Sequence, residues 1–171
     1  MKRKIDAFEY AGTICKAMKP SGILLTTAAE GQVNTMTIGW GTIGVDWSRP
    51  VFIAYVRESR HTKALLEKNP EFTVNIPLGE ADRKILAYCG TKSGRDTDKI
   101  RDLGLTLVDP EEISVPGIKE LPLTLECKVL YKEEQDLSRI PEDILKVYYP
   151  HGDHHHVYYG QIVSAYIIEE E

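Results

Sequence analysis

Apolar and polar residues alternate most clearly in the C-terminal third of the chain. From Leu121 to Tyr131 every second residue is apolar, and only Leu130 breaks the polar series between them. A period of two is typical of a strand with one buried face. His155–Ile168 is a longer run of β-forming residues with Gly160 inside it. Because glycine in a strand often marks a bend, we expect a bent strand there.

Shorter patterns predict the remaining elements. Runs of β-branched and apolar residues predict further strands at Ile23–Ala28, Val33–Ile43, Val51–Val56 and Phe72–Ile76. Helical spacing of apolar residues and helix-ending signals predict helices at Asp6–Lys19, Thr62–Lys68, Asp82–Cys89 and Thr97–Leu103. Many strands with a few short helices and no regular βαβ rhythm predict a mainly β fold, either a closed or a split antiparallel barrel.

The sequence also predicts how one strand bends and where two of the helices begin. Val33–Ile43 is interpreted as one continuous strand that bends at its glycines. Ser59 and Thr62 are candidate N-caps of the second predicted helix, and Asp96 or Thr97 of the fourth, because short polar side chains accept hydrogen bonds from the first helical N–H groups.

Length and composition limit the class of protein. A chain of 171 residues suits one domain, so we expect a single domain over residues 1–171. The longest apolar runs, such as Val51–Val56, are far shorter than the ~20 residues of a membrane-spanning helix. We therefore expect no membrane partner. The three cysteines form no CxxC pair, which favours a reducing cytoplasm over a disulfide framework or a cysteine zinc site.

Charge is distributed unevenly along the chain. The net charge is −5, which argues against a general nucleic-acid binder. Met1–Leu105 holds 16 Lys and Arg against 12 Asp and Glu, or +4, whereas Thr106–Glu171 holds 5 against 14, or −9. A modest anion such as a phosphate would find its partners in the first part. The alternative is that the C-terminal acids only keep the surface soluble.

Polar side chains and glycines are mixed into the strand-like segment Asn34–Gly41. Glycine in a strand often marks the close approach of a ligand or of another backbone. A flat heteroaromatic ring with a hydrogen-bonding edge would suit this segment, which begins with Asn34, Thr35, Met36 and Thr37. The alternative is that the threonines only favour a strand and a glycine forms a bulge.

The segment Arg57–Thr62 lies between a predicted strand and a predicted helix. A helix N-terminus presents free N–H groups and the positive end of the helix dipole. With Ser59, Arg60 and Thr62 beside it, this segment would suit a phosphate. The alternative is that the hydroxyl groups only cap the helix and the arginines lie in solvent.

A second polar loop, Thr91–Lys99, joins two predicted helices. It contains Ser93 and Gly94 and ends at Lys99. The loop is either a further contact with a phosphate or ring, or only a flexible connection. Cys89 and Cys127 lie in patterns typical of core positions, so we expect no thiol nucleophile.

Four of the five histidines lie within His151–His156. Along a strand, His154 and His156 would share one face and His155 the other. The sequence shows no second group of cysteines, histidines or carboxylates that would complete a set of ligands, so we expect no metal site. The open alternatives are one histidine beside a redox or substrate pocket, and a polar loop without a role.

Taken in order, these segments resemble the flavin reductase-like family of FMN-binding split barrels, and the flavoredoxin branch in particular. The similarity extends from about Ala17 to Ile168. The stretches that carry it are Asn34–Trp40, Asp46–Val51, Arg57 with Ser59–Thr62, Phe72–Pro77, Ser93-Gly94 with Asp98-Lys99, and His156 with Gly160–Val163.

The resemblance implies a six-stranded split barrel of Greek-key type with peripheral helices, and a homodimer with FMN at or near the subunit interface. It also implies the roles of the site residues. The isoalloxazine edge would be faced by Asn34, Thr35, Met36 and Thr37. The phosphate would be held by Ser59, Arg60 and Thr62, with Lys99 as a further contact. The loop residues Ser93 and Gly94 would close over the flavin.

The activity implied is an oxidoreductase that passes electrons between NAD(P)H and free flavin or an acceptor protein, with FMN either tightly bound or exchangeable. His156 would lie on the nicotinamide side of the flavin and would be the one candidate catalytic residue. The flavin would supply the redox chemistry, so no catalytic acid or base is required. The alternatives are an FMN-binding electron carrier or sensor without NAD(P)H turnover and, more distantly, a histidine-rich metal-binding barrel.

Overall fold

Ten strands and five α-helices form in the part of the chain that the computed structural model describes, residues 1–80 and 82–169. The strands are β1 (Lys2–Lys4), β2 (Ile23–Ala29), β3 (Gln32–Ile38), β4 (Gly41–Asp46), β5 (Arg49–Arg57), β6 (Glu71–Ile76), β7 (Leu107–Val108), β8 (Gly117–Ile118), β9 (Leu123–Glu134) and β10 (His155–Ile168). The helices are α1 (Ala11–Met18), α2 (His61–Lys68), α3 (Arg83–Thr91), α4 (Lys99–Leu103) and α5 (Glu142–Tyr148), with short 3-10 helices η1 (Ala7–Tyr10) and η2 (Leu137–Arg139).

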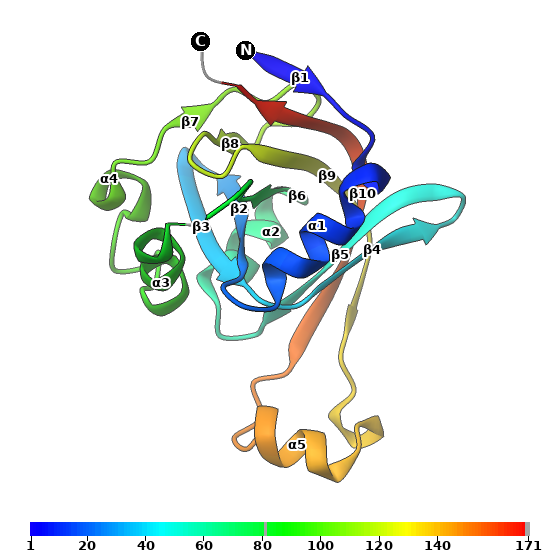
Figure 1. Cartoon of the computed structure of the whole chain (residues 1–171). Coiled ribbons are helices and arrows are strands. Elements are labelled where there is room, and N and C mark those ends of the chain that lie inside the picture. Colours follow the sequence, from blue (N-terminus) through cyan, green and yellow to red (C-terminus); the bar gives the residue numbers. More distant parts are fainter. Residues whose placement is uncertain (81, 170–171) are drawn as a thin grey trace.

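One curved antiparallel sheet forms the body of the molecule (Figure 1). Its strand order is β3-β2-β6-β9-β10-β5-β4, and β1 pairs with β10 outside this path. The order is linear, so β3 and β4 lie at its two ends although they follow each other in the chain. The predicted mainly β split barrel with peripheral helices is confirmed. Six strands run from β3 to β5, and β4 and β1 extend the sheet at its edges.

The single bent strand expected at Val33–Ile43 is wrong, because the chain leaves one end of the sheet and joins the other. β3 ends at Ile38, and β4 begins at Gly41 and pairs with β5. A Cβ atom on Gly41 would lie 2.6 Å from the Phe52 ring. The glycine is therefore needed for close approach to the neighbouring strand rather than for a bulge within one strand.

The predicted helix caps are also wrong. Arg60 occupies the N-cap position of α2 without a side-chain hydrogen bond, and Asp98 caps α4 by accepting from the Arg101 N–H. Ser59 is engaged elsewhere, and Thr62 lies inside the helix with its hydroxyl beside Asn34. For Ser59 and for Thr62, hydrogen bonds to distant residues compete with the local preference of these side chains for the helix cap.

The main core fills the inside of the curved sheet, and α1 packs against it (Figure 1). Its members include Ile14, Met18, Leu25, Phe52, Phe72 and Val74. A second apolar cluster, made by Leu24 with residues of α3 and the following segments, covers the other face of β2. This second cluster holds α3 and α4 beside β3, which brings the loop between these helices to the edge of the sheet.

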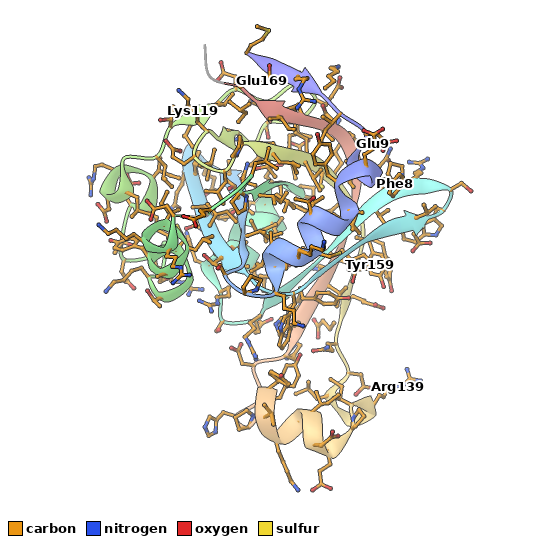
Figure 2. All side chains as sticks on the ribbon, viewed as in Figure 1. Phe8, Glu9, Lys119, Arg139, Tyr159 and Glu169 are labelled. Carbon is orange, nitrogen blue, oxygen red and sulfur yellow. The ribbon has the colours of Figure 1, made fainter. Side chains whose placement is uncertain are left out.

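An arm extends between β9 and β10 (Figure 1). It contains η2 and α5, neither of which was predicted from the sequence pattern. In Figure 2, Arg139 lies on this arm, and Glu169 lies at the opposite end of the molecule, beside β1. β10 connects these two ends, and its bounds are those expected from the sequence. None of the described helices is long and apolar enough to cross a membrane.

Candidate functional site

Two adjoining clefts lie where β3, β5, α2 and the α3–α4 loop meet. The larger cleft has a volume of about 160 Å³ and the smaller cleft about 130 Å³. They share Met36 and Arg60. The larger cleft is lined further by Thr37, Trp40, Tyr55, Arg57 and His155. The smaller cleft is lined further by Asn34, Ser59, Thr62, Ser93, Gly94 and Lys99.

The predicted site residues are thus brought together from four separate parts of the chain. All of the predicted cofactor-binding residues except Thr35 line one of the two clefts. Thr35 has its side chain in the interior, where Thr26 donates a hydrogen bond to its hydroxyl at 3.0 Å. Side chains alternate along a strand, so Thr35 points inward while Asn34 and Met36 line the clefts. Thr37 also lines the larger cleft, although its hydroxyl donates to the Leu86 carbonyl oxygen at 2.7 Å.

A close approach between Asn34 and Gly94 shapes the smaller cleft. The Asn34 amide donates to the Thr62 hydroxyl at 3.1 Å. A Cβ atom on Gly94 would lie 2.1 Å from Oδ1 of the Asn34 side chain, so a larger residue would displace Asn34 or the loop. Gln32 donates to the Gly94 carbonyl at 3.1 Å, and Arg95 donates to the Ser59 carbonyl at 2.9 Å. These bonds fix the loop against both β3 and the start of α2.

Lys99 lines the smaller cleft and is hydrogen-bonded to buried backbone carbonyl groups. Its side chain is 4% exposed, and its ammonium group donates to the carbonyl oxygens of Thr35 at 2.9 Å and Cys89 at 3.0 Å. An ammonium group has three N–H donors, so one remains for a ligand. Burial lowers the pKa of Lys99 and raises that of the Cys89 thiol to about 11, so Cys89 is a neutral thiol near neutral pH.

The smaller cleft is electrostatically suited to an anion. Arg60, Arg95 and Lys99 line it together with the first residues of α2. Burial lowers the pKa of His61, and the charges of Arg95 and Lys99 lower it further, which reports a positive local potential. The N–H groups of the first helical turn add donors at the same place.

Ser59 lines this cleft, but a carboxylate occupies both of its donors. Its N–H and hydroxyl donate to the two oxygens of Asp153 at 2.9 and 2.8 Å. Burial raises the pKa of the Asp153 carboxyl, but the hydrogen bonds from Ser59 and the charge of Arg57 outweigh this, so its pKa lies below the usual value. Ser59 therefore positions the loop, and a ligand would have to displace Asp153 to bind its hydroxyl. No sequence pattern predicts this contact, because its partners lie 94 positions apart in the chain.

His155 is the histidine of the larger cleft. It is 5% exposed, its Nδ1 atom is hydrogen-bonded to the Tyr149 hydroxyl at 2.8 Å, and its ring lies 5.1 Å from that of Trp40. Burial lowers the pKa of His155 to about 4, and the charge of Arg57 contributes to the shift. The imidazole is therefore neutral near neutral pH.

His156 lies elsewhere than we expected. It faces away from His155 and lines neither cleft, and its Nε2 atom contacts the Glu58 carboxylate. The alternation of side chains along β10 explains the difference, since a shift of one residue moves a side chain to the opposite face. The sequence pattern located the histidine run correctly but did not select the residue that faces the cleft.

Similarity to known proteins agrees with this geometry. Residues 18–171 match the family model of the flavin reductase like domain. An uncharacterized protein of Archaeoglobus fulgidus is 34% identical over 135 residues, which are 78% of this chain and 74% of the relative. Flavoredoxin from Methanosarcina acetivorans has 28% identity and a TM-score of 0.66, over 87% of this chain and 69% of that chain.

A further solved structure shares the fold. The NADH:FAD oxidoreductase from Streptomyces globisporus C-1027 has 20% identity and a TM-score of 0.65, over 97% of this chain and 87% of that chain. The resemblance expected from the sequence, including that to flavoredoxins, is confirmed. The chain belongs to the flavin reductase-like family.

Proposed function

We propose that this protein binds FMN across the two clefts and transfers electrons between NAD(P)H and free flavin or a downstream acceptor. The observation that carries the proposal is the adjacency of the clefts. A cationic cleft at a helix N-terminus opens beside a larger cleft lined by a strand and aromatic side chains, with Arg60 common to both. FMN has the corresponding two parts, a phosphate and a flat ring system.

The smaller cleft fits a phosphate by its chemistry. Arg60 and Lys99 supply positive charge, and the first turn of α2 supplies N–H donors. The close approach of Gly94 to Asn34 leaves no room for a side chain on the loop, which suits a loop that lies directly over a ligand. Thr62 contributes through its bond with Asn34, which orients the amide at the cleft wall.

The edge of β3 supports the placement of the ring. β3 is at the end of the strand order and pairs only with β2 among the described strands, so its outer backbone groups have no strand partner there. In an extended strand the N–H and C=O of one residue point to the same side. The Thr35 carbonyl oxygen points outward to Lys99, so its N–H does too. Two residues along the strand, the backbone groups of Thr37 point outward in the same way, and Thr37 lines the larger cleft, where such groups can read the hydrogen-bonding edge of a flavin.

His155 takes the role first expected of His156. A bound flavin would supply the redox chemistry, accepting hydride equivalents at its ring. The chain would contribute binding, orientation and exclusion of water. His155 is neutral and held by Tyr149, so it would orient a nicotinamide by hydrogen bonding and packing rather than by charge. Trp40 and Tyr55 would limit the access of water to the same cleft.

A second copy of this chain is our proposed cover for the larger cleft. A groove of about 880 Å³ shares Trp40 and Tyr55 with that cleft and is lined on its far side by Ile144 and Tyr148 of α5. A partner seated in this groove would bury these side chains and place FMN near the subunit interface. We place the protein in the cytoplasm, in keeping with its cysteines, which form no disulfide in the described residues.

The test is the absorption spectrum of the purified protein with FMN, before and after anaerobic NADH or NADPH. The proposal predicts a bound flavin spectrum that either nucleotide bleaches. A bound flavin that neither nucleotide bleaches would favour the electron carrier without NAD(P)H turnover. A protein that binds no FMN would contradict the proposal as a whole.

A further inference from the structure

A cluster of two histidines and a carboxylate lies on the face of β10 opposite the larger cleft. It consists of Glu58, at the end of β5, with His154 and His156, at the start of β10. One ligand atom of each residue lies within 4.8 Å of the other two. The Glu58 N–H donates to the His154 carbonyl oxygen at 3.0 Å, so the backbone itself holds the three residues together.

Each histidine keeps one buried ring nitrogen without a hydrogen-bond partner. These are Nε2 of His154 and Nδ1 of His156, and the His156 side chain is only 3% exposed. Buried polar atoms are nearly always hydrogen-bonded, and an exception calls for a bound water or ion. A polar network that is only partly satisfied is costly in the protein interior. A metal ion bound at Nε2 of His154 would give that nitrogen a partner, and Nε2 of His156 already faces the Glu58 carboxylate.

We infer that Glu58, His154 and His156 bind a divalent transition-metal ion of the zinc class. Two imidazoles and one carboxylate form a donor set that suits zinc and its first-row neighbours. Metal–ligand distances of about 2.0–2.2 Å would place tetrahedral ligand atoms about 3.4 Å apart, so small side-chain rotations would complete the site. The Glu58 and His154 side chains are 48% and 30% exposed, which leaves the ion open to water on one side.

Two neighbours set the charge of the site. The Glu134 carboxylate lies 3.7 Å from Nε2 of His154 and is within reach as a further ligand. The Lys63 ammonium lies 3.3 Å from a Glu58 oxygen and competes with a cation for that carboxylate. Removing the lysine charge should therefore tighten metal binding, an effect not expected if the cluster is only a set of ion pairs.

The test is calorimetric titration of the chelator-treated full-length protein with zinc chloride near neutral pH. The wild-type chain should bind one Zn²⁺, with at least ten-fold weaker binding in His154→Gln and in Glu58→Gln. His151→Gln is the matched control, because His151 is an exposed member of the same run outside the cluster, and it should bind as the wild type does. Lys63→Gln should bind more tightly.

A second readout does not depend on flavin or on activity. Zinc should raise the unfolding temperature of the wild type and of His151→Gln, but much less that of His154→Gln. Equal zinc affinity in the wild type and His154→Gln would overturn the inference, as would a wild type that binds no zinc. Weaker binding in Lys63→Gln would also count against it.

Discussion

The side chains at the clefts are held by hydrogen bonds to the backbone and to one another, and those of Lys99 and Asn34 are buried. Lys99 is fixed by two carbonyl oxygens, Asn34 bonds with Thr62, and Asp153 holds the Ser59 loop. Such contacts set the positions of side chains before a ligand arrives, which lowers the entropic cost of binding. Replacing one of these side chains should therefore have an effect that its known neighbours predict.

His155 is predicted to affect the rate of flavin reduction. His155→Ala should slow the reduction of bound flavin by NAD(P)H while FMN affinity stays close to that of the wild type, because the ring faces the larger cleft and not the phosphate region. Stopped-flow reduction measures the rate, and a flavin titration measures the affinity. His151→Ala, at an exposed position in the same run, should behave as the wild type. An unchanged rate in His155→Ala would remove the histidine from the mechanism.

The depressed pKa of His155 also predicts a dependence of stability on pH. The unfolded chain binds a proton at this residue near pH 6.5, whereas the folded chain binds it near a pKa of about 4. Between these values the unfolded state holds more protons, so stability falls as the pH falls from about 6.5 toward 4, by up to about 3 kcal/mol. Urea unfolding of the wild type and of His155→Gln across this range measures the difference. Identical pH profiles would contradict the prediction.

The polar segments, taken together with the family resemblance, predicted most of the lining of the clefts. They failed where the face of a strand decides the outcome. Thr35 and His156 are each one position away from a residue that lines a cleft. A one-residue uncertainty in register moves a side chain to the other face, and a single sequence does not determine that register when polar residues occupy both faces.

At the scale of elements, the α3–α4 loop and β3 form one unit through Lys99. Its side chain crosses from the start of α4 to the backbone of β3 and to the end of α3. Removing the ammonium group would leave two carbonyl oxygens without this donor and would take one cation from the smaller cleft. The unit would therefore couple the stability of the fold to the proposed binding of an anion.

Lys99→Met tests this coupling. The variant should lose about 1–3 kcal/mol of unfolding free energy, through the unpaired carbonyl groups, and should bind FMN at least ten-fold more weakly. Urea unfolding and flavin titration measure the two effects. Lys84→Met is the control, because Lys84 is an exposed residue of α3 that lines neither cleft, and it should change neither quantity. A loss of stability without a loss of FMN affinity would leave Lys99 with a structural role only.

Sequence patterns predicted an element best where a long run of β-forming residues covered the whole of it. β10 has the predicted bounds because its β-rich run is long and ends at clear breaks. The division between β3 and β4 was missed because both strands are rich in β-formers, and only pairing with different neighbours separates them. The helix α5 has only seven residues and none of them is buried, so its few apolar residues, such as Ile144 and Tyr148, are too short a run to establish a helical period.

At the scale of the molecule, apolar groups remain exposed around the larger cleft and at the β4–β5 hairpin. Trp40 and Trp47 are 42% and 53% exposed, and Val45 is 68% exposed. Contiguous exposed apolar surface commonly marks an interaction site. The sheet was predictable from the sequence, but the position of this exposed apolar surface was not, since it depends on residues brought together by folding.

We predict that the protein forms a dimer in solution. Sedimentation equilibrium should give about twice the 19.3 kDa mass of one chain. Replacing Ile144, an exposed residue of α5 that lines the shared groove, by Asp should weaken the dimer, because it would place a charge against apolar surface. A stable monomer that retains FMN would contradict the proposed cover for the larger cleft.

The central claim is that the smaller cleft holds the phosphate of FMN, and a paired titration tests it most directly. Riboflavin has the same ring system as FMN without the phosphate. Arg60→Ala removes a charge-assisted contact worth about 1.5–3 kcal/mol, so FMN should bind at least ten-fold more weakly than to the wild type, while riboflavin affinity should change little. The same FMN dissociation constant in Arg60→Ala and the wild type would place the phosphate elsewhere and contradict the account.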